Sequence, residues 1–204
     1  MTEFGIDVSH HNQVDDWHAV HGNNISFVSV KVSESTDFTD DAAGKHADGA
    51  RSAGIHVGGY HFARHVDVAG QVHHFVANLR AHGLLSADSL APMLDMEANE
   101  LRSSASTFVP EFIRLLRAET GIRRVLVYGN LDWWQNVLRP AAWADEDVSL
   151  WIARFNGVPG QPGWSHPRLA LHQHSDKGNV PGIPGHVDRD ATVGTRTVAS
   201  VLIG

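Results

Sequence analysis

Short runs of apolar residues alternate with longer amphipathic stretches through the larger part of the chain. The runs are rich in β-branched and aromatic residues, and runs of this length and composition are typical of buried strands. They predict strands at residues 4–9, 25–32, 55–62, 93–97 and 124–129.

Each amphipathic stretch has the spacing of a helix that covers one face of a sheet. The stretches predict helices at residues 14–21, 40–53, 68–82, 105–120 and 131–138. In the third of them, Val72, Phe75, Val76 and Leu79 recur at helical spacing and form one apolar stripe. Glycine follows three of the stretches where a helix commonly ends, at Gly54, Gly83 and Gly121.

The pattern changes after the fifth helix. Strands are predicted at 148–153, 168–174 and 186–189, but loops rich in glycine and proline separate them instead of helices. Strands joined by helices predict a parallel sheet, either an α/β barrel or a doubly wound sheet. Because the later strands lack crossover helices, we expect a barrel-like sheet with an irregular second part.

The chain is expected to form one α/β domain over residues 1–204. A doubly wound nucleotide-binding fold would carry a glycine fingerprint after its first strand. Here that strand is followed by Ser9-His10-His11-Asn12, and no P-loop pattern occurs elsewhere. Nucleotide binding is therefore disfavoured. Residues 191–204 are expected to form a closing strand or the root of a linker.

Net charge, the length of apolar runs and the absence of cysteine argue against several kinds of binding partner and site. The formal net charge of −7 argues against a nucleic-acid partner, because phosphate binding requires clustered Lys and Arg. No apolar run approaches the length of a membrane span. The absence of cysteine excludes disulfides, thiolate metal sites and cysteine nucleophiles. Since Met1-Thr2-Glu3 lead directly into a strand, we expect no secretory signal peptide.

Two carboxylates follow the apolar run at residues 91–94. If residues 93–97 form a strand, Asp95 and Glu97 point to the same face, roughly 7 Å apart along the strand. Two like charges this close repel each other, and this unfavourable arrangement indicates that the two carboxylates have a function. The alternative is a strand end that leads into an acidic helix start, where Glu97 and Glu100 favour the helix N-terminus.

Other polar and aromatic residues also stand at predicted strand ends. Parallel α/β barrels build their sites at the carboxyl ends of strands, so these side chains should meet in one acidic bowl. Aromatic rings and carboxylates together suit a sugar, since rings stack on sugar faces and carboxylates serve as acid and base. The candidates for the bowl beside Asp95 and Glu97 are Asp7, Glu34, Tyr60, Tyr128, Trp151, Gln173 and Asp188.

These motifs, taken in their order along the chain, resemble those of a known protein family. The segments concerned are Phe4-Gly5-Ile6-Asp7-Val8-Ser9 with His11-Asn12-Gln13, Val30-Lys31-Val32-Ser33-Glu34, Gly58-Gly59-Tyr60-His61-Phe62, Leu94-Asp95-Met96-Glu97, Val127-Tyr128, Leu150-Trp151-Ile152-Ala153 and Gly185-His186-Val187-Asp188. Together they resemble glycoside hydrolase family 25, the muramidase-type lysozymes, over nearly the whole chain. The resemblance implies an irregular (β/α)5β3 TIM-like barrel, in agreement with the pattern of predicted elements.

Two segments depart from the pattern of that family. His172-Gln173-His174 stands where the family usually has Trp-Gln-Tyr, and Arg189-Asp190-Ala191 stands where a run with Asn and Phe is usual. Neither departure removes a carboxylate. Both departures change which side chains could contact a sugar near these strands.

The resemblance also implies an activity and roles for the carboxylates. The activity is hydrolysis of the β-1,4 bond between N-acetylmuramic acid and N-acetylglucosamine in bacterial peptidoglycan. Glu97 would be the general acid, and Asp95 would stabilise the transition state or orient the 2-acetamido group of the substrate. Asp7 and Asp188 would bind or orient the sugar, with Tyr60, Tyr128, Trp151, Glu34 and Gln173 as further substrate contacts. No cofactor or metal is expected.

Two alternatives belong to other classes. Fifteen histidines allow a metal-dependent polysaccharide deacetylase, which would use an Asp and two His. His61 and His65 do not share a helix face, however, and His61 would point either into the bowl or into the wall behind it. The second alternative is a carbohydrate-binding barrel without catalysis, against which the full set of carboxylates counts.

The biological setting stays open between two expectations. A lysozyme without a signal peptide fits a phage endolysin in the host cytoplasm that acts on the cell wall. It fits equally the catalytic domain of a secreted enzyme. In both settings we expect a monomer whose partners are peptidoglycan glycan strands, not nucleic acid or a membrane.

Overall fold

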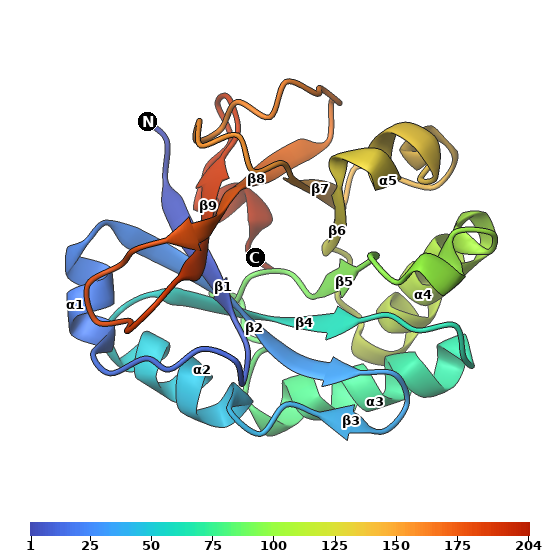
Figure 1. Ribbon diagram of the computed structural model, residues 1–204. Coiled ribbons are helices and arrows are strands. Elements are labelled where there is room, and N and C mark those ends of the chain that lie inside the picture. Colours follow the sequence, from blue (N-terminus) through green and yellow to red (C-terminus); the bar gives the residue numbers. More distant parts are fainter.

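Nine strands form one sheet in the computed structural model, which describes residues 1–204 (Figure 1). The strand order is β1-β9-β8-β7-β6-β5-β4-β2-β3, and β1 also pairs with β2, so that all strands but β3 close into a barrel. The strands are β1 (Phe4–Val8), β2 (Ile25–Glu34), β3 (Phe38–Thr39), β4 (His56–Phe62), β5 (Met93–Asp95), β6 (Val125–Asn130), β7 (Val148–Ala153), β8 (Leu169–Gly178) and β9 (Val187–Thr192).

A helix follows each strand in the first part of the barrel but not in the last. The α-helices are α1 (Trp17–Gly22), α2 (Ala43–Ser52), α3 (Val68–Ala81), α4 (Ala105–Thr120) and α5 (Leu131–Asn136). Three short 3-10 helices are η1 (Asn99–Leu101), η2 (Pro140–Ala142) and η3 (Val198–Val201). None of the helices is both long and apolar enough to cross a membrane.

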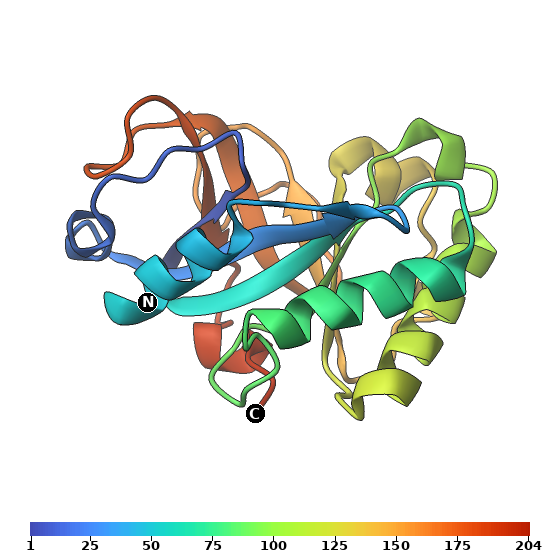
Figure 2. The same cartoon turned by 90° about the horizontal axis from the view of Figure 1, so that it is seen from below.

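The irregular (β/α)5β3 barrel predicted from the sequence is confirmed. Neighbouring strands from β1 round to β8 run parallel, whereas β9 runs antiparallel to both β8 and β1 and closes the barrel. Figures 1 and 2 show α2, α3 and α4 packed along one side, while loops accompany the orange and red strands β8 and β9.

Apolar side chains fill two compartments. The larger one lies between the sheet and the helices and includes the stripe Val72, Phe75, Val76 and Leu79 of α3. The smaller one lies inside the barrel and includes Phe27, Leu126, Trp151 and Leu171. These apolar side chains fill the inside of the barrel, and the inward-pointing polar side chains of the same strands lie nearer the carboxyl ends of the strands.

Several element boundaries differ from those predicted. β5 ends at Asp95, so Glu97 lies in the loop before η1 rather than on the strand. The backbone there remains paired, since the Met96 N–H donates to the Tyr128 carbonyl at 3.0 Å. α2 begins at Ala43 instead of residue 40, because the Asp40 side chain accepts from the Ala42 N–H.

The last residues cover one end of the barrel. Val198 and Val201 of η3 belong to the compartment inside the barrel, and Leu202 forms an isolated bridge with Leu90. The Arg124 Nη1 donates to the Leu202 carbonyl at 2.7 Å. Ala191 and Thr192 belong to β9, and beyond them the chain forms no further strand.

Candidate active site

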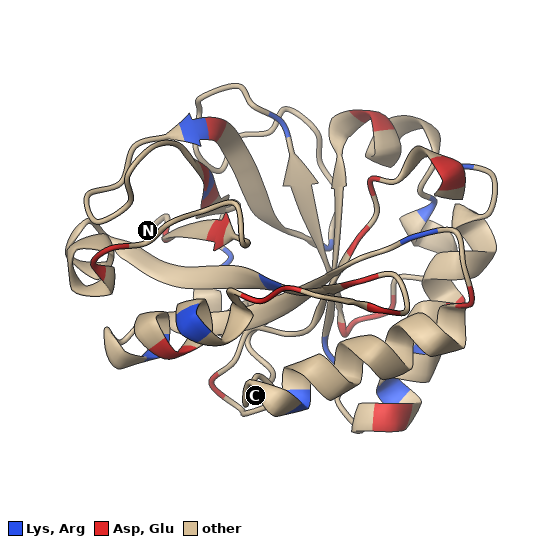
Figure 3. Ribbon diagram, turned by 60° about the horizontal axis from the view of Figure 1, so that its bottom comes forward, with Lys and Arg blue, Asp and Glu red and all other residues tan.

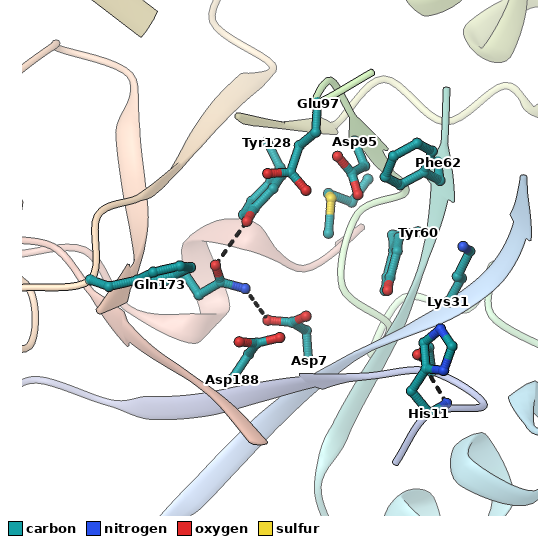
Figure 4. Close-up of a pocket in the computed structure, with 13 residues that line it drawn as sticks. Asp7, His11, Lys31, Tyr60, Phe62, Asp95, Glu97, Tyr128, Gln173 and Asp188 are labelled. Atoms are coloured by element: carbon teal, nitrogen blue, oxygen red, sulfur yellow. Dashed lines mark hydrogen bonds between the residues drawn. The ribbon is translucent and has the colours of Figure 1, made fainter. Parts of the chain in front are cut away.

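A cavity of about 340 Å³ opens at the carboxyl ends of the parallel strands. Its walls combine carboxylates with aromatic rings, the two kinds of side chain that the sequence placed at strand ends (Figure 4). Thirteen residues line it: Asp7, Ser9, His11, Lys31, Tyr60, Phe62, Met93, Asp95, Glu97, Tyr128, Phe155, Gln173 and Asp188.

Four carboxylates stand on two opposite sides of the cavity. Asp7 of β1 and Asp188 of β9 are register partners in the antiparallel pair, so their side chains stand next to each other. Asp95 ends β5, and Glu97 follows two residues later in the loop. Figure 4 shows Asp95 and Glu97 on one side of the pocket and Asp7 and Asp188 on the other. The acidic bowl expected from the sequence is therefore present.

Tyr128 and Gln173 connect the two sides. The Tyr128 hydroxyl donates to the Gln173 Oε1 at 2.8 Å, and the Gln173 Nε2 donates to the Asp7 Oδ2 at 2.7 Å. These two bonds fix the orientation of the Gln173 amide, because its oxygen accepts and its nitrogen donates. Gln173 thus holds one oxygen of Asp7 in place.

Burial raises the pKa of every carboxyl in the cavity, because charge is disfavoured away from water. The pKa of Asp7 rises to about 6 despite the hydrogen bond from Gln173. The pKa of Glu97 rises to about 7 through burial and then the charge of Asp188. The pKa of Asp188 rises to about 8 through burial and then the charge of Asp7. Burial, followed by the charges of Glu97 and Asp7, raises the pKa of Asp95 well above its usual range.

Trp151 does not line the cavity. Its ring is fully buried inside the barrel, edge-on to Tyr128 at a centroid distance of 6.0 Å. The Nε1 donates to the Asp190 Oδ1 at 3.1 Å. The prediction that Trp151 contacts a sugar is wrong, because a position inside the barrel below the strand ends leaves no face open.

Glu34 also lies outside the lining. It forms ion pairs with Lys31 at 2.5 Å and Arg64 at 2.7 Å, which lower the pKa of its carboxyl although burial opposes them. Lys31 lines the cavity in its place. The carboxylate of Glu34 holds the lysine that faces the cavity, and the substrate contact of Glu34 stays a prediction.

The sequence missed six lining residues: Ser9, His11, Lys31, Phe62, Met93 and Phe155. Lys31 had a signal, because a lysine inside an otherwise apolar strand requires a partner. Phe62 lies two residues after Tyr60 and so shares its face of β4. Phe155 follows the end of β7 and keeps 55% of its surface exposed, which only the structure shows.

Of the histidines, only His11 lines the cavity, and the others lie outside its lining. His61 is fully buried in the wall behind it, where its ring nitrogens lie 2.9 Å from the Ser33 Oγ and 3.2 Å from the Gln71 Oε1. His172 and His174 flank Gln173 on β8 and therefore point to the outer face of the barrel. No three His, Asp or Glu side chains are grouped so that they could hold a metal ion.

Comparison with known proteins gives matches over most of the chain. The model for glycosyl hydrolases family 25 matches residues 6–183. Lysozyme M1 of Streptomyces globisporus is 30% identical over 91% of this chain and 66% of its own length. The autolytic lysozyme of Clostridium acetobutylicum is 27% identical over 91% of this chain and 54% of its own length. This chain thus spans less than two thirds of these two relatives.

Among solved structures, the fold matches that of a bacterial lysozyme from Streptomyces coelicolor. The TM-score is 0.80 at 26% identity, and the match covers 98% of this chain and 96% of that one.

Proposed function

The chain belongs to glycosyl hydrolase family 25, and we propose that it is a muramidase that hydrolyses the β-1,4 bond between N-acetylmuramic acid and N-acetylglucosamine in peptidoglycan. The observation that carries the proposal is the position of Glu97, a half-buried carboxyl among three others at the mouth of a barrel lined with aromatic rings. The lysozymes similar to this chain support the choice of substrate.

Glu97 is proposed as the general acid that protonates the leaving glycosidic oxygen. Burial and the neighbouring charge of Asp188 raise its pKa to about 7, so the carboxyl keeps its proton in weakly acidic solution. A general acid is most effective when its pKa lies near the operating pH. Glu97 is also partly exposed, as are Asp7 and Asp188, whereas Asp95 is buried.

Asp95 is proposed to orient the 2-acetamido group of the substrate and to stabilise positive charge at the reacting carbon. Its Oδ1 is buried without a hydrogen-bond partner in the protein, so it can accept from the amide N–H of a bound sugar. Such a donor favours the ionised carboxylate. Once Asp95 is charged, its repulsion keeps the proton on Glu97, so substrate binding separates the two roles.

The deciding experiment is mass spectrometry of peptidoglycan digested by the protein, before and after borohydride reduction. Muramidase action predicts reduced muramic acid ends, whereas reduced glucosamine ends would mean that the other glycosidic bond is cut. Sugar binding without new reducing ends would indicate a carbohydrate-binding barrel. Loss of activity on chelation would indicate a metal-dependent hydrolase.

The role of Glu97 is tested by Glu97→Gln, which keeps the shape of the side chain and removes its acidic proton. We expect kcat to fall by roughly 10²–10⁴-fold, the usual contribution of a general acid. Glu100→Gln is the matched control, because Glu100 is an exposed glutamate nearby that pairs with Arg64 at 3.3 Å. A Glu97→Gln variant that clears peptidoglycan as fast as Glu100→Gln would refute the assignment.

A further inference from the structure

Asp190 is a fifth carboxyl that lies beneath the four in the cavity. It follows Asp188 by two residues on β9, so both side chains point into the barrel. Its register partners are Gly5 on β1 and Gln173 on β8. The side chain is fully buried and lines no cavity, which is costly for a carboxyl without a function.

The two oxygens of Asp190 have different surroundings. Its Oδ1 accepts from the Trp151 Nε1 at 3.1 Å. Its Oδ2 is buried and has no hydrogen-bond partner among the N–H and O–H groups of the protein. Asp7 follows Gly5, the register partner of Asp190, by two residues, and the Asp7 side chain lies within hydrogen-bonding reach of Asp190. Because an ionised carboxylate only accepts, two carboxyls can share a hydrogen bond only if one of them carries a proton.

The surroundings of Asp7 and Asp190 determine which of the two carboxyls carries the shared proton. Asp7 borders the cavity and accepts a hydrogen bond from Gln173, and both conditions favour its charged form. Asp190 has no contact with water, and burial followed by the charges of Asp7 and Asp188 raises its pKa well above the usual range. A carboxylic acid that an apolar site keeps neutral can serve as a hydrogen-bond donor.

The other groups around Asp190 do not reverse this order. From β6 it is faced by the Tyr128 hydroxyl, whose pKa burial raises well above its usual value, so that it stays neutral. β7 and β8 contribute the neutral side chains Trp151 and Gln173. Arg189 is the adjacent cation on β9, but strand alternation turns it to the opposite face.

We propose that Asp190 is a positioning residue that keeps its proton and donates it in a hydrogen bond to Asp7, so that the Asp7 carboxylate is held ionised and fixed for the reaction. This role rests on the proposed function, because Asp7 borders the same cavity as Glu97. Asp7 then receives hydrogen bonds from Gln173 and Asp190, and also from Asp188 while that neighbour is protonated. Removal of the donor should make Asp7 harder to ionise.

Two variants separate the hydrogen bond from the rest of the side chain. Asp190→Asn keeps an oxygen that accepts from Trp151 and supplies an N–H that donates to Asp7. Asp190→Leu keeps a similar shape but can do neither. The titration of Asp7 and Asp190 is followed in the free protein by ¹³C NMR of labelled aspartate carboxyls, and the acid limb of the pH profile of kcat is recorded with peptidoglycan.

The proposal predicts that the Asp190 carboxyl of the wild type stays protonated through the pH range in which Asp7 ionises, whereas ordinary aspartates are already charged there. It predicts that Asp190→Leu raises the midpoint of Asp7 by about one pH unit or more and shifts the acid limb equally, whereas Asp190→Asn leaves both near the wild-type values. Ionisation of Asp190 before Asp7, or an unchanged Asp7 midpoint in Asp190→Leu, overturns it.

The NMR titration uses no substrate, so it decides the role of Asp190 even if the protein releases no reducing ends. If Asp190→Leu does not fold, the wild-type titration decides alone. The proposed muramidase activity is judged separately, by the products of wild-type digestion.

Discussion

Glu97 and Asp95 are two positions apart in the chain, yet they reach the cavity from different backbone settings. Asp95 is the last residue of β5, and Glu97 stands in the loop that leads to η1. This difference explains their burial, because Asp95 is 5% exposed whereas Glu97 is half-buried. In the proposed mechanism the more exposed carboxyl, Glu97, is the proton donor, and the more enclosed one, Asp95, is the partner for a substrate amide.

Phe155 offers a test at the same scale. Its exposed ring borders the cavity, so a bound sugar that covers the ring would bury apolar surface, which contributes roughly 25 cal/mol per Å². We expect Phe155→Ala to raise KM for peptidoglycan fragments by about 2- to 10-fold and to leave the melting temperature unchanged. Val158→Ala serves as control, since Val158 is 43% exposed and does not line the cavity. Equal KM values for the two variants would remove Phe155 from the binding surface.

At the scale of elements, β1 closes the barrel and supplies Asp7 to the cavity. It pairs with β2 on one side and with β9 on the other, so it closes the barrel and sets Asp7 opposite Asp188. Gly5 is necessary for this arrangement, because a Cβ at this position would lie 2.2 Å from the ring of Phe27. A small residue in β1 thus lets a large one fill the barrel below Asp7.

The same contact predicts the effect of adding one methyl group. Gly5→Ala must displace the Phe27 ring, and overpacking of this kind typically costs about 1–3 kcal/mol of unfolding free energy. Denaturant unfolding measures the loss. Gly22→Ala is the matched control, because a Cβ at Gly22 meets nothing within 4 Å. If Gly5→Ala were as stable as Gly22→Ala, the close packing of β1 on Phe27 would be contradicted.

The facing carboxyls of β1 and β9 make stability depend on pH. Asp188 has a folded pKa of about 8 against a usual 3.8, so the folded state holds its proton more tightly than the unfolded state. The stabilisation from that proton is complete below pH 3.8 and is lost as pH rises through about 8.

We therefore expect Asp188→Asn, which removes the charge, to raise the free energy of unfolding at pH 8 by up to about 1 kcal/mol. At pH 4 the gain should shrink, because the wild-type carboxyl is then still protonated in the folded state. Paired denaturant unfolding curves at the two pH values measure the difference. A variant that is less stable than the wild type at pH 8 would show that the charge of Asp188 is compensated.

At the scale of the whole molecule, closure of the barrel brings together side chains that are far apart in the chain. Asp7, Asp95 and Asp188 come from the first, middle and last strands, and Gln173 links the ends by its bond to Asp7 across 166 positions. Elsewhere along the chain, Lys and Arg residues are interspersed with Asp and Glu residues on helices and loops (Figure 3). The proposed chemistry depends on the cavity, where four carboxyls lie close together and Lys31 also lines the wall.

The combined titration of the cluster predicts the pH dependence of activity. Asp7 must be ionised, and its pKa of about 6 sets the acid limb. Glu97 must be protonated, and its pKa of about 7 sets the basic limb. We expect kcat/KM for peptidoglycan fragments to follow a bell with its maximum between these two values. An activity that still rises above pH 8 would contradict the assignment of Glu97 as the acid.

Most helices and strands could be predicted from the local pattern of apolar and polar residues. The end of one strand and the depth of one side chain in the barrel could not. Helix α4 and strand β7 begin and end where the apolar spacing predicts, because each buries one face along its whole length. The end of β5 was placed two residues too late, since pairing with β4 and β6 and not residue type decides where that strand stops. Trp151 was misplaced because strand alternation gives the face of a side chain but not its depth in the barrel.

The amino-acid pattern was sufficient for the class of fold and for the carboxylates, since strand periodicity and strand ends are local properties of the chain. It could not supply the pairing of Asp7 with Asp188, the turn of His61 toward the helices or the burial of Asp190 under Asp7. These features depend on the register and closure of strands distant in sequence. The pKa values that assign roles to the carboxyls follow from that closure, because burial and neighbouring charge exist only in the assembled barrel.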